Sequence, residues 1–296
     1  MKTSLDCYPC FLRNVLNAAR LSGADEDTQK RIVAESLDVL REQPPAGRTP
    51  PELMSQMLAL TALRTGVADP YAAAKRECNR QARLWLPALE RSLAASADPV
   101  ALALRISVIG NVMDLGAFES FDIGSLLEKA EHHILKGNAE AGLRARLEQG
   151  GDLVCIADNA GEVFFDMLLL KTLAAQYRLG KVRLLLRDKP FLNDTCLCEA
   201  EEAGLAGTAQ GVELGQLPLS SPDGGLPDFG TATVIAKGMA NYERFSEHES
   251  MFFLFMVKCA PVGQYASRQS GSDIGNGDWV LITNERSENR ASVPCP

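Results

Sequence analysis

The sequence has 296 residues, of which 46% are hydrophobic and 23% are charged, and its formal net charge at pH 7 is −8. A chain of this length and composition can bury a sizeable core, which excludes a globally disordered protein. The acidic balance argues against nucleic acid or an anionic membrane surface as a partner, because both require a basic face.

The first half of the sequence predicts helices. In residues 11–21, Leu12, Val15, Leu16 and Ala19 have the i, i+3, i+4, i+7 spacing of one apolar helical face. Further helical patterns cover residues 25–42, 51–66, 69–93, 99–113 and 122–151. We therefore expect a helical N-terminal domain over residues 1–148 that contributes to the functional site.

The second half alternates short apolar runs with helix-like segments. The runs are residues 152–158, 182–188, 232–238, 251–258 and 278–284. Continuous apolar runs are typical of strands buried on both faces of a parallel sheet. The pattern predicts a Rossmann-like, doubly wound α/β domain with a mainly parallel sheet over residues 149–285. Residues 209–230 are expected to form a long Gly/Pro-rich loop, and residues 286–296 a flexible tail.

No segment predicts a membrane span or an export signal. No apolar run reaches the roughly 20 residues that a spanning helix needs, and Asp6 and Arg13 interrupt the N-terminal segment where an export signal has its apolar core. The eight cysteines are therefore expected to be reduced thiols in the cytoplasm. Cys7 and Cys10 have C-x-x-C spacing without an evident second ligand pair for zinc. Packing at a helix start is favoured, and a metal or redox role stays open.

Polar side chains follow the first two predicted strands. Asp158 and Asn159 end the first, and Asn193 and Asp194 lie on the loop after the second. Because neighbouring parallel strands end at the same edge of a sheet, these side chains are expected to share one crevice. Carboxylate and amide oxygens suit Mg²⁺, Mn²⁺ or a similar divalent ion. The alternative is that each aspartate caps the helix that follows it.

Lysines end the next two predicted strands. Lys237 and Gly238 could present a cation and a bare N–H to an anion, and Lys258 follows a very apolar run. Two lysines at strand ends that face a metal would form a phosphate clamp, in which the metal and the lysines bind the phosphate together. The alternative is a strand-to-helix turn with a surface lysine.

Further polar residues are candidates for contacting substrate or for orienting water and ligands. Asn111 and Asp114 share a helical face, where a helix end at Gly110 is the alternative. The other candidates are Glu162, Asn193, Asn241, Tyr242 and Glu243.

Several segments, taken in order, resemble the damage-control phosphatase family, long known as domain of unknown function 89. They are CYPCFLR, DPYAAAKRECN, GNVMD, DNAGEVFFD, RDKPFLNDTC, AKGMANYE and VKCAPVG. Each is weak alone, but the ordered set covers most of the chain, and the C-x-x-C resembles the mainly prokaryotic branch. The resemblance implies a helical N-terminal part packed on a Rossmann-like domain. It also implies metal-dependent hydrolysis of phosphomonoesters, typically sugar phosphates and damaged phosphorylated metabolites.

The resemblance also implies roles for individual residues. The metal ligands would be Asp158, Asn159 and Asp194. The residues contacting a small phosphorylated metabolite would be Met239, Ala240, Asn241, Tyr242, Glu243 and Lys258. The implied cofactor is a divalent ion, Mn²⁺, Mg²⁺, Co²⁺ or Ni²⁺. The eukaryotic branch often has an acid and a basic residue where this chain has Met239 and Glu243, so its sugar specificity does not carry over.

The mechanistic hypothesis assigns catalysis to Asp158, Asp194 and Lys258. The aspartates hold the metal together with Asn159. Lys258 and Lys237-Gly238 neutralise charge spread over the transferring phosphoryl group, and an activated water attacks phosphorus. Asp158 as a covalent nucleophile is the alternative. Two other functions stay open. One is an S-adenosylmethionine-dependent carboxyl methyltransferase, for which no Gly-rich cofactor loop is seen. The other is a non-catalytic sensor of a sugar phosphate and metal. The oligomeric state is not predicted.

Overall fold

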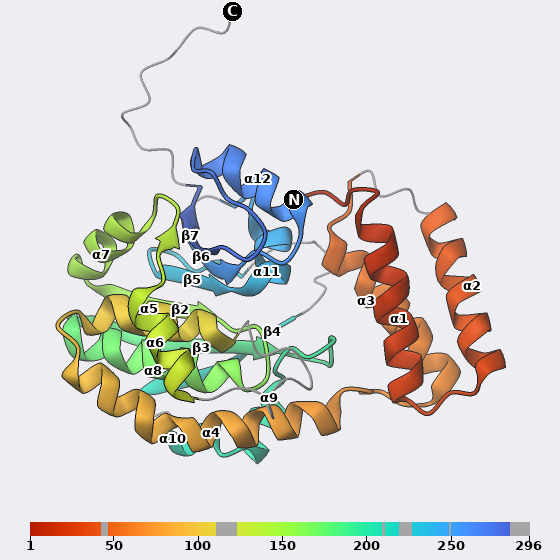
Figure 1. The fold of residues 1–296 in the computed structure, drawn as a ribbon, viewed down its shortest axis with the longest axis horizontal. Coiled ribbons are helices and arrows are strands. Elements are labelled where there is room, and N and C mark those ends of the chain that lie inside the picture. The colour runs from red at the N-terminus through yellow and green to blue at the C-terminus, as the bar shows by residue number, and fades with distance from the viewer. Residues whose placement is uncertain (43–46, 111–122, 209–210, 219–226, 249, 285–296) are drawn as a thin grey trace, which may run out of the picture.

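A sheet of seven strands lies at the centre of the computed structural model, which describes residues 1–42, 47–110, 123–208, 211–218, 227–248 and 250–284 (Figure 1). Its strands are Leu135–Lys136 (β1), Gly151–Ile156 (β2), Leu179–Arg187 (β3), Val212–Leu217 (β4), Thr233–Lys237 (β5), Met251–Met256 (β6) and Trp279–Thr283 (β7). Their order is β1-β7-β6-β5-β2-β3-β4. All neighbouring pairs are parallel except β6 with β7. The predicted α/β fold with a mainly parallel sheet is confirmed.

The direction in which strands are added reverses at β2. β3 and β4 extend the sheet on one side of β2, whereas β5 and β6 extend it on the other. In open α/β sheets, the crevice beyond the carboxyl ends of the strands at such a reversal is where ligands bind. We therefore expect a ligand to bind near the segments that follow β2 and β5.

Helices cover both faces of the sheet. Side chains alternate along each strand, so Leu153 and Cys155 of β2 face one layer while Val154 and Ile156 face the other. The first layer contains α4 (Ala72–Ala95), α5 (Pro99–Ile109), α6 (Ile123–His132), α7 (Glu140–Glu148) and α8 (Glu162–Gln176). The second contains α11 (Gly238–Phe245) and α12 (Ala260–Ser270).

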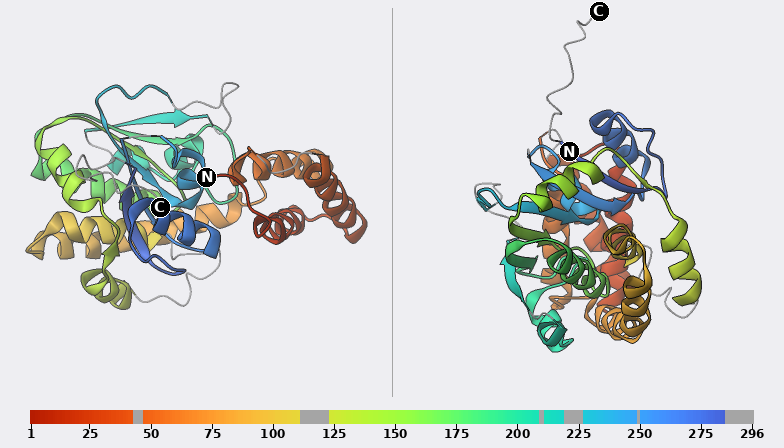
Figure 2. Two further views of the ribbon diagram at one scale, coloured as in Figure 1. Left: turned by 90° about the horizontal axis from the view of Figure 1, so that it is seen from above. Right: turned by 90° about the vertical axis from the view of Figure 1, so that its left-hand side faces the viewer.

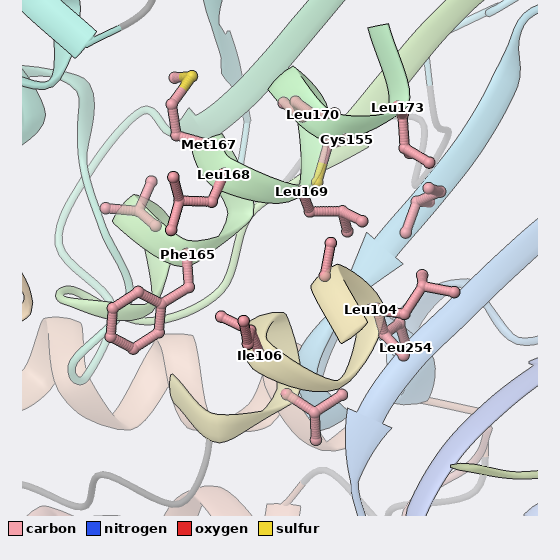
Figure 3. Close-up of a cluster of buried hydrophobic side chains, with 14 of the residues drawn as sticks. Leu104, Ile106, Cys155, Phe165, Met167, Leu168, Leu169, Leu170, Leu173 and Leu254 are labelled. Carbon is pink, nitrogen blue, oxygen red and sulfur yellow. The ribbon is translucent and has the colours of Figure 1, made fainter. Parts of the chain in front are cut away.

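The larger core lies between the sheet and helices α5 and α8. Figure 3 shows Leu104 and Ile106 of α5 gathered with Phe165 and Leu169 of α8 and with Cys155 of β2. Nearly every residue of α5 is buried, as expected for a helix that is apolar on all sides. This close packing holds the amino end of α8, where the β2 loop ends, against the sheet.

The first three helices form a separate bundle beside the sheet (red and orange in Figures 1 and 2). They are α1 (Cys7–Leu21), α2 (Glu26–Glu42) and α3 (Pro50–Thr65). The bundle has its own core, which includes Val15 and Ala19 of the predicted apolar face; Leu12 and Leu16 are only half-buried. Phe191, from the loop after β3, is also part of this core. The bundle is thereby joined to the edge of the sheet where ligands are expected.

Two strands lie where the sequence predicted none. β4 lies in the predicted loop 209–230, because its polar and glycine-containing sequence forms a strand only by pairing with β3 at the sheet edge. β1 interrupts the predicted helical region 122–151 and pairs with β7. Two short helices, α9 (Leu197–Glu202) and α10 (Leu205–Thr208), follow β3. The predicted domain boundary at residues 148/149 stays a prediction, and the predicted tail 286–296 lies outside the described residues.

Among the described helices, none has both the length and the apolar character needed to cross a membrane. The cysteines in these parts of the chain are free thiols.

Candidate active site

A cavity of about 320 Å³ lies between the helical bundle and the carboxyl ends of the strands. The predicted site residues that line it are Asp158, Asn159, Asn193, Asp194, Met239, Ala240, Glu243 and Lys258. The bundle contributes Asp6, Cys7, Cys10, Phe11, Asn14, Pro50, Pro51 and Met54. Segments far apart in the sequence therefore meet at the crevice that the strand order indicates.

Glycines shape the backbone around Asp158. Gly161 has φ 82° and ψ −53° and precedes the first residue of α8. Gly238, at the start of α11, has φ 77°, and a Cβ there would overlap the carboxyl group of Asp158. Both positions are left-handed, where other residues are strained. Close approach of α11 to the β2 loop therefore holds the Asp158 carboxyl group in place.

Hydrogen bonds join the β2 loop to the β3 loop. The N–H of Thr195 donates to the carbonyl of Asp158 at 2.8 Å, and the N–H of Ala160 donates to the carbonyl of Asn193 at 2.9 Å. These bonds bring Asp194 beside Asp158. The helix-cap alternative is wrong for both aspartates, because the residues that precede α8 and α9 are Gly161 and Cys196.

Arg187 is a site residue that the sequence reasoning missed. Its Nε donates to Asp194 Oδ2 at 2.7 Å and its Nη2 donates to Asn241 Oδ1 at 2.9 Å. Arg187 is the last residue of β3 and is buried. A charged residue at the end of a buried apolar strand needs a partner of opposite charge or polarity, so the position of Arg187 in the sequence could have indicated its role.

The carboxyl group of Asp158 is in an unfavourable place for a negative charge. Burial raises its pKa well above the ordinary value, and the nearby charges of Asp194 and Glu162 raise it further, against smaller opposing effects of Lys258 and Arg187. Burial also raises the pKa of Asp194, although Arg187 opposes this. A cation between the two carboxylates would offset both effects.

Lys237 does not point into the cavity. Side-chain alternation in β5 directs it to the same face as Ile235, toward α5 and α8. Its Nζ donates to Asp166 Oδ1 at 2.8 Å, to the Ser107 carbonyl at 2.9 Å and to Glu162 Oε1 at 2.5 Å. The ammonium group of Lys237 is therefore surrounded by partners inside the protein.

Acidic groups outnumber cations around these strand ends. The buried carboxylates that the structure describes here are Asp158, Glu162, Asp166 and Asp194. The buried cations that pair with them are Arg187 and Lys237. Lys75 is buried nearby with two carboxylate partners of its own. Lys237 contacts both Glu162 and Asp166, whereas Arg187 contacts Asp194. Asp158 is therefore the buried carboxylate here whose charge a bound cation would neutralise.

The residues present fit a divalent ion. Asn159 Nδ2 donates to Asp158 Oδ2 at 2.8 Å and to Glu162 Oε2 at 3.0 Å, which fixes the orientation of the Asn159 amide. Within the described ranges, no three His, Cys, Asp or Glu side chains converge as a metal cage. Two carboxylates and one amide could act as donors there, which would leave positions for water and substrate oxygens, as is usual for Mg²⁺.

Of the remaining predicted residues, Lys258 and Glu243 line the cavity, whereas Asn241 and Tyr242 lie outside its lining. Lys258 is exposed at the cavity, and burial raises the pKa of Glu243 to about 8. Asn241 is buried, and its Nδ2 donates to the carbonyls of Ala157 and Lys237 at 2.9 and 2.7 Å. Tyr242 is buried in the core of the second layer, outside the cavity lining.

Glu162 and Gly238 also lie outside the lining, although each contacts a residue within it. Asn111 and Asp114 lie outside the described residues.

The two thiols of the C-x-x-C motif also line the cavity. Cys7 is the first residue of α1, and Cys10 lies one turn later. Cys259, which precedes α12, lines the same cavity. Burial raises the pKa of Cys10, and it raises the pKa of Cys259 to about 11.

Two proteins with similar sequences are both named damage-control phosphatases. The chain is 31% identical over 291 residues to a damage-control phosphatase from Archaeoglobus fulgidus, covering 93% of this chain and 98% of that protein. It is 24% identical over 273 residues to a damage-control phosphatase from Pyrococcus horikoshii, covering 89% and 94%. These relatives support a phosphatase role.

A solved structure and a family model agree with this relationship. The crystal structure of a DUF89 family protein from Pyrococcus horikoshii has a TM-score of 0.81 to this fold at 22% identity, covering 96% of this chain and all of that one. The model of the damage-control phosphatase ARMT1-like domain matches residues 3–274. Given that match across most of its length, the chain belongs to the damage-control phosphatase ARMT1-like domain family.

Proposed function

We propose that this protein is a divalent-metal-dependent phosphomonoester hydrolase that acts on sugar phosphates or damaged phosphorylated metabolites. The observation that carries the proposal is a pair of buried carboxylates, Asp158 and Asp194, at a 320 Å³ cavity on the carboxyl edge of the sheet. In the hydrogen bonds described, the buried Arg187 contacts only Asp194 of this pair. Neighbouring carboxylates repel a phosphate, and a bound divalent cation would offset that repulsion, which supports a metal at this site.

Different residues of the chain would bind the ion, orient its ligands and bind the phosphoryl group. Asp158, Asp194 and the amide oxygen of Asn159 would hold the ion, which when bound polarises a phosphoryl oxygen and activates water. Arg187 binds one oxygen of Asp194 and so fixes the orientation of that carboxylate. Lys258, exposed at the same cavity, supplies positive charge to the phosphoryl group as charge spreads over its oxygens.

The cavity limits the substrate to a small molecule. Its volume is at the lower end of the roughly 300–1,000 Å³ typical of ligand pockets. Phe11, Met54 and Phe191 supply apolar wall, whereas Asn14 and Glu243 are polar groups able to bind hydroxyls. Such a wall suits a compact phosphorylated metabolite with few hydroxyl groups in contact with protein.

The test is phosphate release from a panel of phosphomonoesters by metal-stripped protein. Mg²⁺, Mn²⁺, Co²⁺ and Ni²⁺ are added back singly, and the panel includes p-nitrophenyl phosphate, fructose phosphates and other sugar phosphates. We expect release only with metal, and its loss in Asp158→Ala and in Asp194→Ala. Asp38→Ala is the matched control, because Asp38 is an exposed carboxylate on α2.

Two results would contradict the proposal. Near-normal turnover in both site variants would show that these carboxylates do not hold the ion. No release with any metal, from protein that binds metal, would favour a non-catalytic sensor. A rise in melting temperature with S-adenosylmethionine would then favour a methyltransferase, because a ligand of the native state stabilises it.

A further inference from the structure

One face of α4 contacts the two loops that carry the candidate metal ligands. Lys75 and Asn79 lie four residues apart, so they share a helical face. Lys75 is fully buried and Asn79 is 3% exposed. Polar side chains are rarely buried on a long helix unless each has a specific partner.

Asn79 binds the backbone of the β2 loop. Its Oδ1 accepts from the N–H of Gly161 at 2.7 Å in a buried environment. Gly161 is in the left-handed region, and a Cβ there would lie 3.0 Å from the carbonyl oxygen of Cys78. Helix α4 therefore contacts this peptide both by the Asn79 hydrogen bond and by close packing, and an uncommon backbone conformation is held from outside the loop.

The Gly161 peptide is continuous with the candidate ligands. Asp158 and Asn159 precede it, and the Asn159 carbonyl accepts from the N–H of Val163 at 3.2 Å, which begins the ladder of α8. A rotation at Gly161 would therefore move the Asn159 amide and the Asp158 carboxyl group together. Asn79 fixes this rotation although it contacts neither ligand side chain in the hydrogen bonds described.

Lys75 acts on the other loop in a parallel way. Its Nζ donates to Glu199 Oε1 at 3.1 Å and to Asp69 Oδ2 at 2.9 Å. Glu199 Oε2 in turn accepts from the N–H of Cys196 at 3.3 Å, two residues after Asp194. The same helix face thus reaches both loops.

We propose that Asn79 is a positioning residue that sets the orientation of Asp158 and Asn159 through its hydrogen bond to the Gly161 peptide. The inference rests on the proposed metal site. Partners that orient metal ligands typically contribute about 10- to 100-fold to metal affinity or activity. We expect a loss in that range when the bond is removed.

The experiment compares three variants in the full chain. Asn79→Ala removes the acceptor, and Asn79→Asp keeps a carbonyl-type oxygen in the same place. Leu89→Ala is the control, because Leu89 is buried on the same helix but contributes only packing. The measurements are the hydrogen-exchange rate of the Gly161 amide, the Kd for Mn²⁺ by calorimetry, and kcat and KM. Asn79→Leu, which is close to asparagine in size and has no acceptor, replaces Asn79→Ala if the alanine variant does not fold.

The expected result separates positioning from stability. Asn79→Ala should speed Gly161 exchange, weaken Mn²⁺ binding and lower kcat by about 10- to 100-fold, at temperatures well below its melting point. Asn79→Asp should recover most of each loss. Leu89→Ala should lower the melting temperature while leaving Kd and kcat unchanged.

An unchanged Mn²⁺ Kd in Asn79→Ala would overturn the inference, and so would equal losses in Asn79→Ala and Asn79→Asp. A lack of turnover by the unmodified protein would contradict the proposed function instead. In that case Gly161 exchange and the Mn²⁺ Kd still decide the role of Asn79.

Discussion

Two groups of buried charges lie side by side in this protein, each with two carboxylates and one cation, and they differ in how many of the carboxylates the cation contacts. The open cluster consists of Asp158, Asp194 and Arg187 and lies at the cavity. The closed cluster consists of Lys237, Glu162, Asp166 and Ser107 and lies between β5, α5 and α8. Asn159 links them, because its amide donates to both Asp158 and Glu162.

The closed cluster supplies its own cation, placed between its acids. Burial alone would lower the pKa of Lys237, but Asp166 and Glu162 raise it above the ordinary value. In the open cluster, Arg187 pairs with Asp194 while Asp158 has no cation in hydrogen-bond contact among the described residues. The comparison teaches that burial of charge does not mark a functional site. The mark is a buried carboxylate next to a cavity with no cation in hydrogen-bond contact among the described residues.

The largest expected effect is on folding, from Lys237→Met in the closed cluster. Removing the cation leaves Glu162 and Asp166 buried without it, which typically costs about 3–5 kcal/mol of unfolding free energy. Urea denaturation of metal-free protein measures this. Lys181→Met, an exposed lysine on β3, is the control and should change stability by less than about 0.5 kcal/mol. An unchanged midpoint for Lys237→Met would remove the distinction between the two clusters.

Metal should stabilise the open cluster. At 100 times its Kd, a bound Mn²⁺ raises the free energy of unfolding by about 2.7 kcal/mol, because it binds only the native state. Asp158→Asn should abolish this increase, while Asp38→Asn on α2 should retain it. Thermal melts with and without Mn²⁺ provide the measurement. A full increase in Asp158→Asn would place the ion elsewhere.

Without metal, Asp158→Asn is expected to have a smaller effect on the free energy of unfolding, and in the stabilising direction. Asp158→Asn keeps an oxygen that accepts from Asn159 but removes a charge that Asp194 and Glu162 repel. In EDTA the variant should be as stable as the unmodified protein or more stable, by on the order of 1 kcal/mol. Clear destabilisation in EDTA would mean that the Asp158 charge is balanced inside the protein after all.

A separate expected effect is a change in the pH dependence of stability at Glu243. Burial raises its pKa to about 8 from an ordinary value of 4.5, so between these values the folded state holds a proton that the unfolded state has released. The free energy of unfolding therefore falls as pH rises from about 4.5 to 8, with the full loss present above pH 8. Glu243→Gln should flatten the melting temperature over this window. Exposed Glu247→Gln should not, and parallel profiles for Glu243→Gln and the unmodified protein would contradict the prediction.

Local sequence patterns were enough to predict the sheet domain. The runs around β2, β3, β5, β6 and β7 are apolar because these strands are buried, so their pattern is independent of the partner strand. β4 was missed because it is an edge strand whose polar residues give no such pattern. The meeting of Asp158 and Asp194 at one edge followed from the expectation that parallel neighbours end together.

Local sequence patterns could not distinguish the roles of Lys237 and Lys258. Lys237 and Lys258 both follow apolar runs, and the sequence assigned both to phosphate. Lys237 is still within β5, so the pleat turns it toward α8, whereas Lys258 lies two residues beyond β6 and is exposed at the cavity. One residue of register decides such a direction, because side chains alternate with a period of two.

The sequence by itself determined the α/β fold, the buried strands and the candidate oxygen ligands, since these depend on residue type and on order along the chain. Only the tertiary structure decided which charges are balanced, that Arg187 pairs with Asp194, and that Asn79 of α4 holds the Gly161 peptide. Those facts depend on contacts between residues 7 to 82 positions apart in sequence. Such contacts leave no local pattern, because each partner alone is a common residue in a common element.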